Sequence, residues 1–263
     1  MKEGYTKKIK SIDDKLDKMR IKRKDSDYTK VKEDVFDTPT LISLYNLSNK
    51  GILEALGGAI STGKEANIFF AESNDKPIAL KIYRITTSTF RAMEEYLLGD
   101  PRFKNIRHEK RDIILAWTRK EYRNLLRAQN VGVRVPTPIT TERNILAMDF
   151  LGENEVPYPL LKEIKLDTKQ AHHIYETIKS YMRKLYKDSN LVHGDLSEYN
   201  IMVDPNNMEP IFIDMGQSVT LDHPKAEYFL NRDINNIVRF FKRFKISESS
   251  EDLSAFVRDE NSK

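Results

Sequence analysis

The chain has 263 residues, no cysteine, 32% charged residues and a formal net charge of +4. It is long enough to bury a sizeable core, and it has no apolar run near the roughly 18 residues that span a membrane. These values exclude disulfides, thiolate nucleophiles and cysteine-ligated zinc. No segment has the pattern of a signal peptide, so a cytoplasmic protein with no membrane contact is expected.

The charges are unevenly distributed along the chain. Residues 1–35 hold twelve Lys and Arg against eight Asp and Glu, whereas residues 246–263 hold five acidic and two basic residues. We therefore expect a basic N-terminal arm and an acidic low-complexity tail around a globular part, which divides into an N-lobe at 36–148 and a C-lobe at 149–245. A basic arm can contact RNA phosphates, although a solvated helix explains the same charges.

The first predicted elements are a short helix and a β-hairpin. Thr38 precedes Pro39 as a capping hydroxyl before a first-turn proline, which indicates the start of a helix. Residues 66–71 and 77–83 are strand-like runs. The polar cluster at 73–76 between them predicts an antiparallel hairpin.

A longer helix follows a stretch without clear periodicity. Residues 84–108 predict a loop-rich connection. After it, residues at three- and four-residue spacing predict a helix whose buried face carries one carboxylate. Because an inward-facing carboxylate is costly without a cation or a donor, Glu121 requires a partner. The stripe consists of Ile114, Trp117, Glu121, Leu125 and Ala128.

The second half of the chain is predicted to be mainly helical. A strand at 144–150 is followed by a long amphipathic helix, two short strand-like runs at 201–203 and 211–213, and a last helix that starts near Pro224. Strands early and helices late predict an α+β fold. The inward positions are Ala171, Ile174, Ile178, Tyr181 and Leu185 on the long helix, and Leu230, Ile234, Ile237, Val238 and Phe241 on the last one.

The strongest chemical pattern lies between these two helices. Residues 193–200 read H-G-D-L-S-E-Y-N and residues 213–216 read I-D-M-G, which has the form H-x-D-L-x-x-x-N followed by D-x-G. In phosphoryl transfer one carboxylate orients the attacking oxygen, while an asparagine and a second aspartate hold the metal on the phosphates. The pattern predicts these roles for Asp195, Asn200 and Asp214.

A cation for the nucleotide phosphates is predicted at Lys81. It ends the run I-A-L-K at 78–81, which resembles the strand pattern V-A-I-K, whose lysine meets the phosphates and a helix glutamate. On alternating strand faces, Lys81 lies opposite the apolar side chains of its own strand. We therefore expect an ion pair between Lys81 and Glu121.

Two further segments are predicted to contact the nucleotide. The string at 58–64 has the form G-x-x-x-x-G-K, but Glu65 stands where a Walker loop needs Ser or Thr, so residues 61–67 predict a turn over the phosphates between antiparallel strands. Residues 149–152 can offer backbone groups to an adenine edge, with the preceding methionine behind the base. The predicted contacts are Ser61, Thr62, Gly63, Lys64, Glu65, Met148, Asp149 and Leu151.

Together, the strings S-T-G-K-E-A-N at 61–67, H-G-D-L-S-E-Y-N at 193–200 and I-D-M-G-Q at 213–217 resemble the RIO kinases, most closely the Rio-one subgroup in a short archaeal form. The resemblance covers residues 36–245. It implies a two-lobed protein-kinase-like fold with a small antiparallel-sheet N-lobe and a mainly helical C-lobe. It also implies ATP with Mg²⁺ or Mn²⁺ as cofactors, and the maturing small ribosomal subunit, with its rRNA and proteins, as partner.

The resemblance also implies roles for individual residues. Members of the family are thought to place phosphate transiently on the D-x-G aspartate, which makes Asp214 a candidate acceptor as well as a metal ligand. By the same similarity, Asp195 is the catalytic base, Asn200 binds metal, Lys81 and Glu121 form an ion pair, and Asp149 and Leu151 meet adenine.

Two departures from ordinary protein kinases affect the expected activity. Gly194 stands where H-R-D has arginine, and Ser197 stands where a lysine is usual. Only 47 residues follow Gly216, and they contain no A-P-E string. We expect a truncated C-lobe that lacks an activation segment and a peptide-binding subdomain, so broad peptide phosphorylation is not expected to be the main activity.

Two other functions fit parts of the pattern. A small-molecule phosphotransferase of the aminoglycoside or choline kinase type shares H-G-D and a later aspartate, although its usual second histidine is replaced by Ser197. A nucleotide-gated binding protein would use the ATP site as a conformational switch with negligible catalysis. The preferred interpretation is an ATP-hydrolysing or self-phosphorylating serine/threonine kinase.

Overall fold

The computed structural model describes residues 36–85, 90–103 and 109–259. The predicted basic arm at 1–35 lies outside these residues. Within the described chain there are two compact units. Unit 1 comprises the chain up to Phe90, His108–Arg119 and Pro138–Pro157; unit 2 comprises Arg91–Arg107, Lys120–Thr137 and the chain from Tyr158 onward. Each unit has its own core and is described separately.

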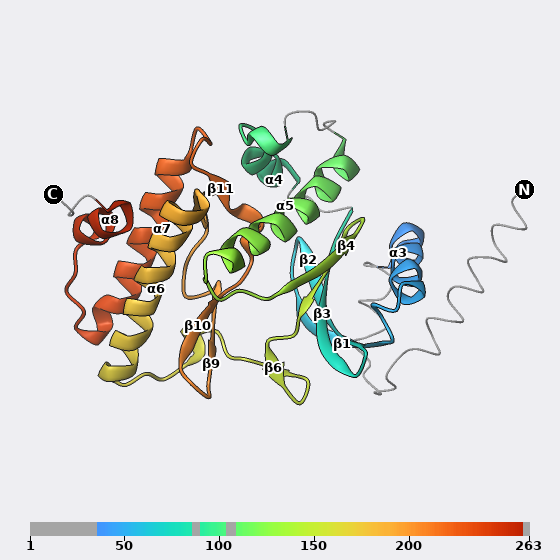
Figure 1. Ribbon diagram of the computed structural model, residues 1–263, viewed down its shortest axis with the longest axis horizontal. Coiled ribbons are helices and arrows are strands. Elements are labelled where there is room, and N and C mark those ends of the chain that lie inside the picture. The colour runs from blue at the N-terminus through green and yellow to red at the C-terminus, as the bar shows by residue number, and fades with distance from the viewer. Residues whose placement is uncertain (1–35, 86–89, 104–108, 260–263) are drawn as a thin grey trace, which may run out of the picture. The chain divides into compact units, whose positions relative to one another are not determined.

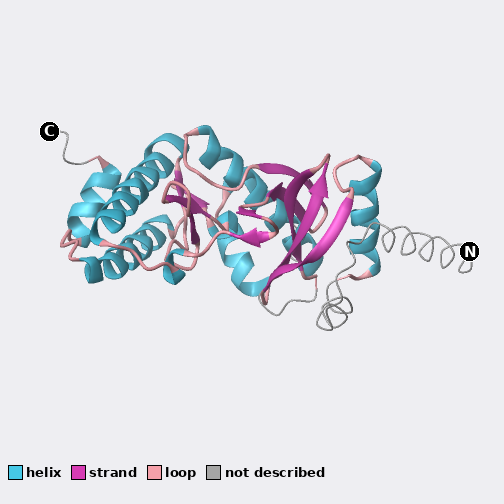
Figure 2. Ribbon diagram, turned by 90° about the horizontal axis from the view of Figure 1, so that it is seen from below, coloured by secondary structure: helices cyan, strands magenta, loops and turns pink. Residues whose placement is uncertain are grey.

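Unit 1 contains a five-stranded antiparallel sheet (Figure 1), whose strands are magenta in Figure 2. The strand order is β1-β2-β3-β5-β4, so the two hairpins β1-β2 and β2-β3 lie side by side. The predicted antiparallel hairpin, β2-β3, is confirmed. The strands are β1 Ala55–Thr62, β2 Ala66–Ser73, β3 Lys76–Tyr83, β4 Pro138–Glu142 and β5 Ile145–Asp149.

One face of this sheet forms the core of unit 1 with helix α3, Thr38–Asn49. The helix starts where the sequence predicts, but its N-cap is Asp37 rather than Thr38, because the Asp37 carboxylate accepts the N–H of Thr40 at 2.9 Å. The apolar side chains of β3 opposite Lys81 point into this core, as expected. Its members include Leu44, Leu47, Phe69, Ile78, Leu80 and Ile82.

The segment that was expected to be loop-rich contains a helix. Helix α4, Phe90–Leu97, and the short 3₁₀ helix η1, Pro101–Phe103, lie within residues 84–108, so the expectation of a loop is wrong for these residues. The helix is fixed by a ring contact in unit 2, where Tyr96 stacks on Phe229 with centroids 4.8 Å apart. An eight-residue helix is too short for its apolar period to be distinctive in a sequence.

Helix α5, Lys110–Asn130, carries the predicted stripe of inward residues. All five members of that stripe are buried, and Glu121 is only 1% exposed. The first half of the helix belongs to unit 1 and the second half, from Lys120, to unit 2. The periodicity therefore identified both the helix and its inward carboxylate correctly.

Unit 2 is built on helices α6, Thr168–Ser189, α7, Ala226–Phe241, and α8, Ser250–Arg258, which lie side by side in Figure 1. The first two were predicted. Helix α8 lies in the predicted low-complexity tail, which is instead folded there: Ser249 and Asp252 form a capping box, and Leu253 and Val257 are fully buried. No helix in the described ranges is long and apolar enough to cross a membrane.

Short elements complete the fold. In unit 2, β9 and β10 overlap the two predicted strand-like runs and pair antiparallel, and β8 pairs with β11 on either side of the residues that carry the motifs. In unit 1, β6 and β7 form a small hairpin after β5. These elements are β6 Gly152–Glu153, β7 Val156–Pro157, β8 Leu191–Val192, β9 Ile201–Asp204, β10 Glu209–Phe212, β11 Val219–Thr220, and the 3₁₀ helices η2 Leu161–Glu163, η3 Met215–Gln217 and η4 Lys242–Phe244.

Candidate active site

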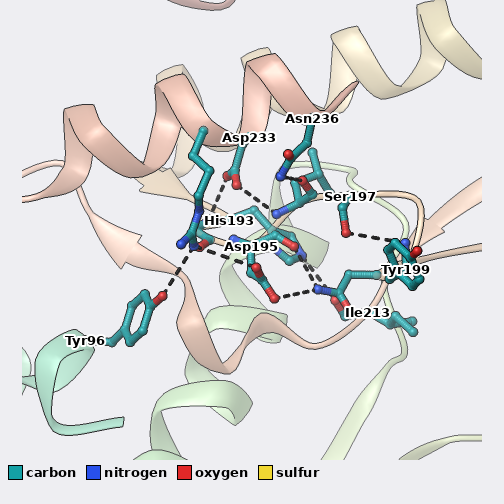
Figure 3. A network of polar contacts seen from close by, with 12 residues as sticks. Tyr96, His193, Asp195, Ser197, Tyr199, Ile213, Asp233 and Asn236 are labelled. Atoms are coloured by element: carbon teal, nitrogen blue, oxygen red, sulfur yellow. Dashed lines mark hydrogen bonds and ion pairs between the residues drawn. The ribbon is translucent and has the colours of Figure 1, made fainter. Parts of the chain in front are cut away.

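The predicted catalytic loop follows β8 and packs beneath α7 in unit 2 (Figure 3). Its second residue, Gly194, has φ of +83°, and a Cβ atom placed there would lie 2.7 Å from the carbonyl oxygen of Gln217. An L residue is strained at this φ, and the nearby backbone leaves no space for a side chain. The arginine of H-R-D therefore cannot occupy this position without moving the backbone.

The backbone of the loop is held by Asp233 on α7. Its two carboxylate oxygens accept the N–H groups of Gly194 and Leu196, each at 2.8 Å. The side chain of Asn236, one turn later, donates to the carbonyl of Leu196 at 3.1 Å. Burial raises the pKa of Asp233 to about 8, while the two N–H donors lower it. Helix α7 thus fixes the backbone at the residues before and after Asp195.

Asp195 and Asn200 form a direct pair within this loop. The Asn200 Nδ2 donates to the backbone carbonyl of Asp195 at 2.8 Å and to its Oδ2 at 2.9 Å. Because the amide nitrogen makes both contacts, the amide oxygen is the atom of Asn200 available to a hard cation. The predicted base and the predicted metal ligand therefore lie side by side.

The charge of Asp195 is set by its surroundings. Burial raises the pKa of the Asp195 carboxyl; the Arg232 guanidinium opposes this shift, the Asp214 carboxylate adds to it, and the Asn200 amide opposes it. Asp214 thus lies near enough for its charge to act on Asp195. An ion pair of 3.7 Å joins Arg232 Nη2 to Asp195 Oδ1.

His193 links the two motif segments. It is 2% exposed, its Nδ1 accepts the N–H of Asp195 at 3.3 Å, and its Nε2 lies 3.1 Å from the carbonyl oxygen of Ile213. This network assigns the proton to Nε2, so both ring nitrogens are satisfied by the protein. His193 is therefore a structural link to the residue before Asp214, with no nitrogen left for proton transfer.

Asp214 has a left-handed backbone with φ of 60° and ψ of 58°, directly before η3. Such a conformation is unfavourable for a residue with a side chain and persists only when its surroundings fix it. Here two buried residues of α5 bind the following carbonyls. Lys120 Nζ donates to Gly216 at 2.7 Å and to Ser218 at 2.5 Å, and Asn124 Nδ2 donates to Met215 at 2.8 Å and to Ser218 at 2.9 Å.

Lys120 is a costly residue in this position. It is fully buried, and burial lowers its pKa well below the ordinary lysine value. Further residues support its neighbour Asn124, because Arg102 donates to the Asn124 amide oxygen at 2.9 Å and to both carboxylate oxygens of Asp100. The D-x-G turn is thus supported through side chains of α5 and the segment around η1.

In unit 1, the predicted phosphate-covering turn connects β1 to β2, as expected. The N–H of Gly63 donates to the carbonyl of Ala66 at 3.0 Å, and the Arg84 N–H donates to the carbonyl of Glu65 at 2.9 Å. Two register shifts interrupt the β1-β2 pairing. The predicted contacts Ser61, Thr62, Gly63 and Lys64 are exposed, and Glu65 is half-buried.

The other predicted nucleotide contacts of unit 1 share one face of the sheet. Met148 pairs with Ala79 across the β3-β5 ladder, so it lies on the same face as Lys81, opposite the α3 core. Asp149 ends β5, and the half-buried Leu151 follows it. Lys81 is 7% exposed. Because Lys81 belongs to unit 1 and Glu121 to unit 2, their ion pair stays a prediction.

The donor set fits a magnesium ion bound partly by nucleotide phosphates. Among the described residues no group of three or more His, Asp or Glu side chains is arranged to hold a metal. Mg²⁺ is commonly held by one or two protein oxygens together with phosphates and water, which the Asn200 amide and the Asp214 carboxylate can supply. When bound, the ion would neutralise phosphate charge.

Five residues that support this site were not predicted. Asp233 lies among the apolar residues of the inward face of α7, so it carries the same signal that identified Glu121: a carboxylate on a buried face. Lys120 and Asn124 flank that glutamate, and their partners are about 90 or more residues away in the sequence. No local pattern points to these contacts. The five are Lys120, Asn124, Arg232, Asp233 and Asn236.

Comparison with known proteins gives one consistent result. A sequence model of the RIO domain matches residues 67–254. The RIO-type serine/threonine-protein kinase Rio1 of Haloferax volcanii is 46% identical over 92% of this chain and 82% of its own. That of Methanocaldococcus jannaschii is 41% identical over 87% and 77%, respectively.

A solved structure shares the fold. It is the Rio2 kinase of Chaetomium thermophilum, described as an ADP/Mg²⁺-phosphoaspartate complex, with a TM-score of 0.60 and 23% identity over 85% of this chain and 71% of that chain. The chain therefore has a kinase-like α+β fold, as the order of strands and helices predicts.

Proposed function

The chain belongs to the RIO family of kinases, and on this basis we propose that it is an ATP-dependent serine/threonine kinase and ATPase that transfers the γ-phosphate to itself or to water. The observation that carries the proposal is the hydrogen-bonded pair of Asp195 and Asn200, held under α7 by Asp233. A fixed carboxylate beside an oxygen ligand for a cation is what phosphoryl transfer requires.

The roles of the two aspartates differ in this proposal. Asp195 would orient the attacking oxygen and accept its proton, while Asp214, with Asn200, would hold Mg²⁺ or Mn²⁺ on the phosphates. In unit 1, Lys81 and the β1-β2 turn would bind the phosphates, and residues 148–151 the adenine. Both motif segments are linked through His193, which supports a joint function.

Asp214 is also the proposed acceptor. One of its carboxylate oxygens would bond to the γ-phosphorus while the bond from that phosphorus to the ADP oxygen breaks, giving an acyl phosphate and ADP. Water would then attack the phosphorus, release inorganic phosphate and restore the carboxylate. The phosphoaspartate in the description of the Chaetomium thermophilum Rio2 structure supports this part of the proposal.

The biological partner is proposed from the family resemblance of the three motif strings. We place the protein in the cytoplasm, acting on the maturing small ribosomal subunit. On the same resemblance we propose a dedicated partner rather than free peptides. The kinase names of the relatives favour this proposal over a small-molecule phosphotransferase.

Labelled ATP tests the proposal directly. The purified chain is incubated with [γ-³²P]ATP and Mg²⁺, with and without small-subunit precursor, and the label is followed in protein, phosphate and precursor. We expect slow turnover that the precursor accelerates. We also expect hydroxylamine to remove the label from the protein, because acyl phosphates are labile to it and phosphoserine is not. EDTA should abolish both signals.

Asp214→Ala supplies the control for this experiment. It removes the proposed metal ligand and acceptor together, so turnover should fall by about a thousandfold or more, and the hydroxylamine-sensitive label should vanish. Full activity of this variant would refute the kinase proposal. Rapid turnover on generic peptides with stable phosphoserine would refute the dedicated-partner part alone.

A further inference from the structure

Arg232 lies on α7, one residue before Asp233, and its guanidinium contacts the catalytic loop. Its Nη2 donates to the carbonyl of Gly194 and to the hydroxyl of Tyr96, the latter at 3.3 Å, and lies 3.7 Å from Asp195 Oδ1. Figure 3 shows Tyr96 joined by a dashed line to the polar network that contains Asp195. The guanidinium thus touches both residues of the Gly194-Asp195 dipeptide.

The contacts of Arg232 complement those of Asn200. Asn200 binds Asp195 Oδ2 at 2.9 Å, whereas Arg232 faces Oδ1. Rotation about the bond to a carboxylate group is soft, so one hydrogen bond leaves its plane free to turn. Two contacts on different oxygens fix the plane, which matters because small errors in orientation are costly in catalysis.

The backbone explains why this arginine comes from α7. A side chain at Gly194 would collide with the carbonyl of Gln217, so the loop cannot carry a guanidinium of its own. All three contacts are made by Nη2: its two N–H groups serve the carbonyl and the hydroxyl, and its positive charge attracts the Asp195 carboxylate at 3.7 Å. The stacking of Tyr96 on Phe229 holds the hydroxyl partner in place.

We propose that Arg232 is a positioning residue for the phosphoryl transfer, which holds the Asp195 carboxylate in its reactive orientation, and that Tyr96 positions Arg232. This inference rests on the proposed function, in which Asp195 orients the attacking oxygen. It assigns to α7 two tasks: Asp233 fixes the loop backbone and Arg232 fixes the reactive side chain.

The test compares variants of the full chain. Arg232→Gln should lower kcat by about 30- to 100-fold and leave KM for ATP within about twofold, because orientation is lost while the nucleotide contacts remain. In Arg232→Ala, added guanidinium ion at millimolar concentration should restore kcat by about tenfold. Lys242→Ala, which removes an exposed cation at the C-terminal end of the same helix, is the control and should keep its activity.

A second readout needs no turnover. The N–H of Asp195 belongs to the peptide whose carbonyl Arg232 binds, so its hydrogen exchange, followed by NMR, should be about tenfold faster in Arg232→Gln and unchanged in Lys242→Ala. If wild-type protein hydrolyses no ATP, the proposed function fails, and this exchange rate still decides the role of Arg232.

The inference is overturned if folded Arg232→Gln keeps its kcat and the Asp195 exchange rate, or if guanidinium restores nothing in Arg232→Ala. If neither Arg232 variant folds, Tyr96→Phe replaces them, since it removes only the hydroxyl that accepts from Arg232. It should lower kcat about three- to tenfold at unchanged KM, and a wild-type kcat would overturn the proposal.

Discussion

The catalytic loop of unit 2 and the β1-β2 turn of unit 1 carry the two most specific motifs, yet their surroundings are opposite. The loop lies under α7, and Asp233, Asn236 and His193 bind its backbone. The turn is exposed on four of its five predicted contact residues, and register shifts interrupt the strand before it.

The difference reflects two kinds of chemistry. A base must be oriented within a fraction of an ångström, so buried polar groups hold the backbone of its loop. A turn that covers phosphates needs backbone N–H groups and positive charge, both of which tolerate movement. Under the proposed function, rigid support would mark where bonds are made and broken, and exposure would mark where the nucleotide enters and leaves.

Asp233→Asn weakens the hydrogen bonds that hold the catalytic loop and should have the largest effect. An amide has one accepting oxygen, so one of the two loop N–H groups would face a donor, at a cost of about 1–3 kcal/mol. We expect the free energy of unfolding to fall by that amount and kcat by about 100-fold. Urea denaturation and ATP turnover measure the two effects. Asp222→Asn, on an exposed aspartate, should change neither.

Lys81 and Glu121 test whether the two units act through one ion pair. If they do, each change to alanine should lower kcat/KM by about ten- to 100-fold, and the double change should cost little more than either one. A double-mutant cycle in ATP turnover gives the coupling free energy. Losses that simply add would show that the two side chains do not interact.

Lys64→Ala tests the exposed side and should have a modest effect. An exposed cation contributes about 0.2–1 kcal/mol to binding an anion, so KM for ATP should rise about two- to fivefold while kcat stays the same. Lys76→Ala, in the other hairpin, is the matched control. A fall in kcat without a change in KM would mean that the turn takes part in the chemical step.

The basic arm should have the smallest effect on turnover, since none of the predicted catalytic, metal-binding or nucleotide-binding residues lies in it. Its Lys and Arg excess predicts that it binds rRNA through phosphates, with a salt slope of about −0.7 for each single-stranded phosphate neutralised. Deleting residues 1–30 should make the salt slope shallower by the contribution of a few phosphates. Equal salt slopes for the full chain and the deletion variant would mean that the arm does not contact RNA.

The sequence predicted long elements and compact motifs well. Clear patterns predicted the strands of the β2-β3 hairpin and the helices α5, α6 and α7. The spacing in H-G-D-L-S-E-Y-N placed Asp195 beside Asn200. Elements that were missed are short or polar. Strand β4 has the sequence PITTE at the sheet edge, and α8 lies in a Ser- and Glu-rich segment where two buried residues suffice.

The residues that support the site could not be predicted from local sequence patterns, for a physical reason. Lys120 and Asn124 bind carbonyls, which every residue possesses, so their partners leave no trace in the sequence. Asp233 is different, because a carboxylate on the buried face of α7 breaks an apolar stripe. The argument that identified Glu121 extends to it. A buried charge is thus the more informative signal, since the fold must provide a partner for it.

Gly194 constrains how this sequence can change over time. Any substitution there strains the backbone and brings a new Cβ atom against Gln217, so it is disfavoured whatever the side chain. An arginine at this position becomes acceptable only after the turn containing Gln217 has moved, and that turn is fixed by α5. A mutational route to the ordinary H-R-D arrangement must therefore begin elsewhere in the chain, and its order is dictated by sterics rather than by selection on the loop.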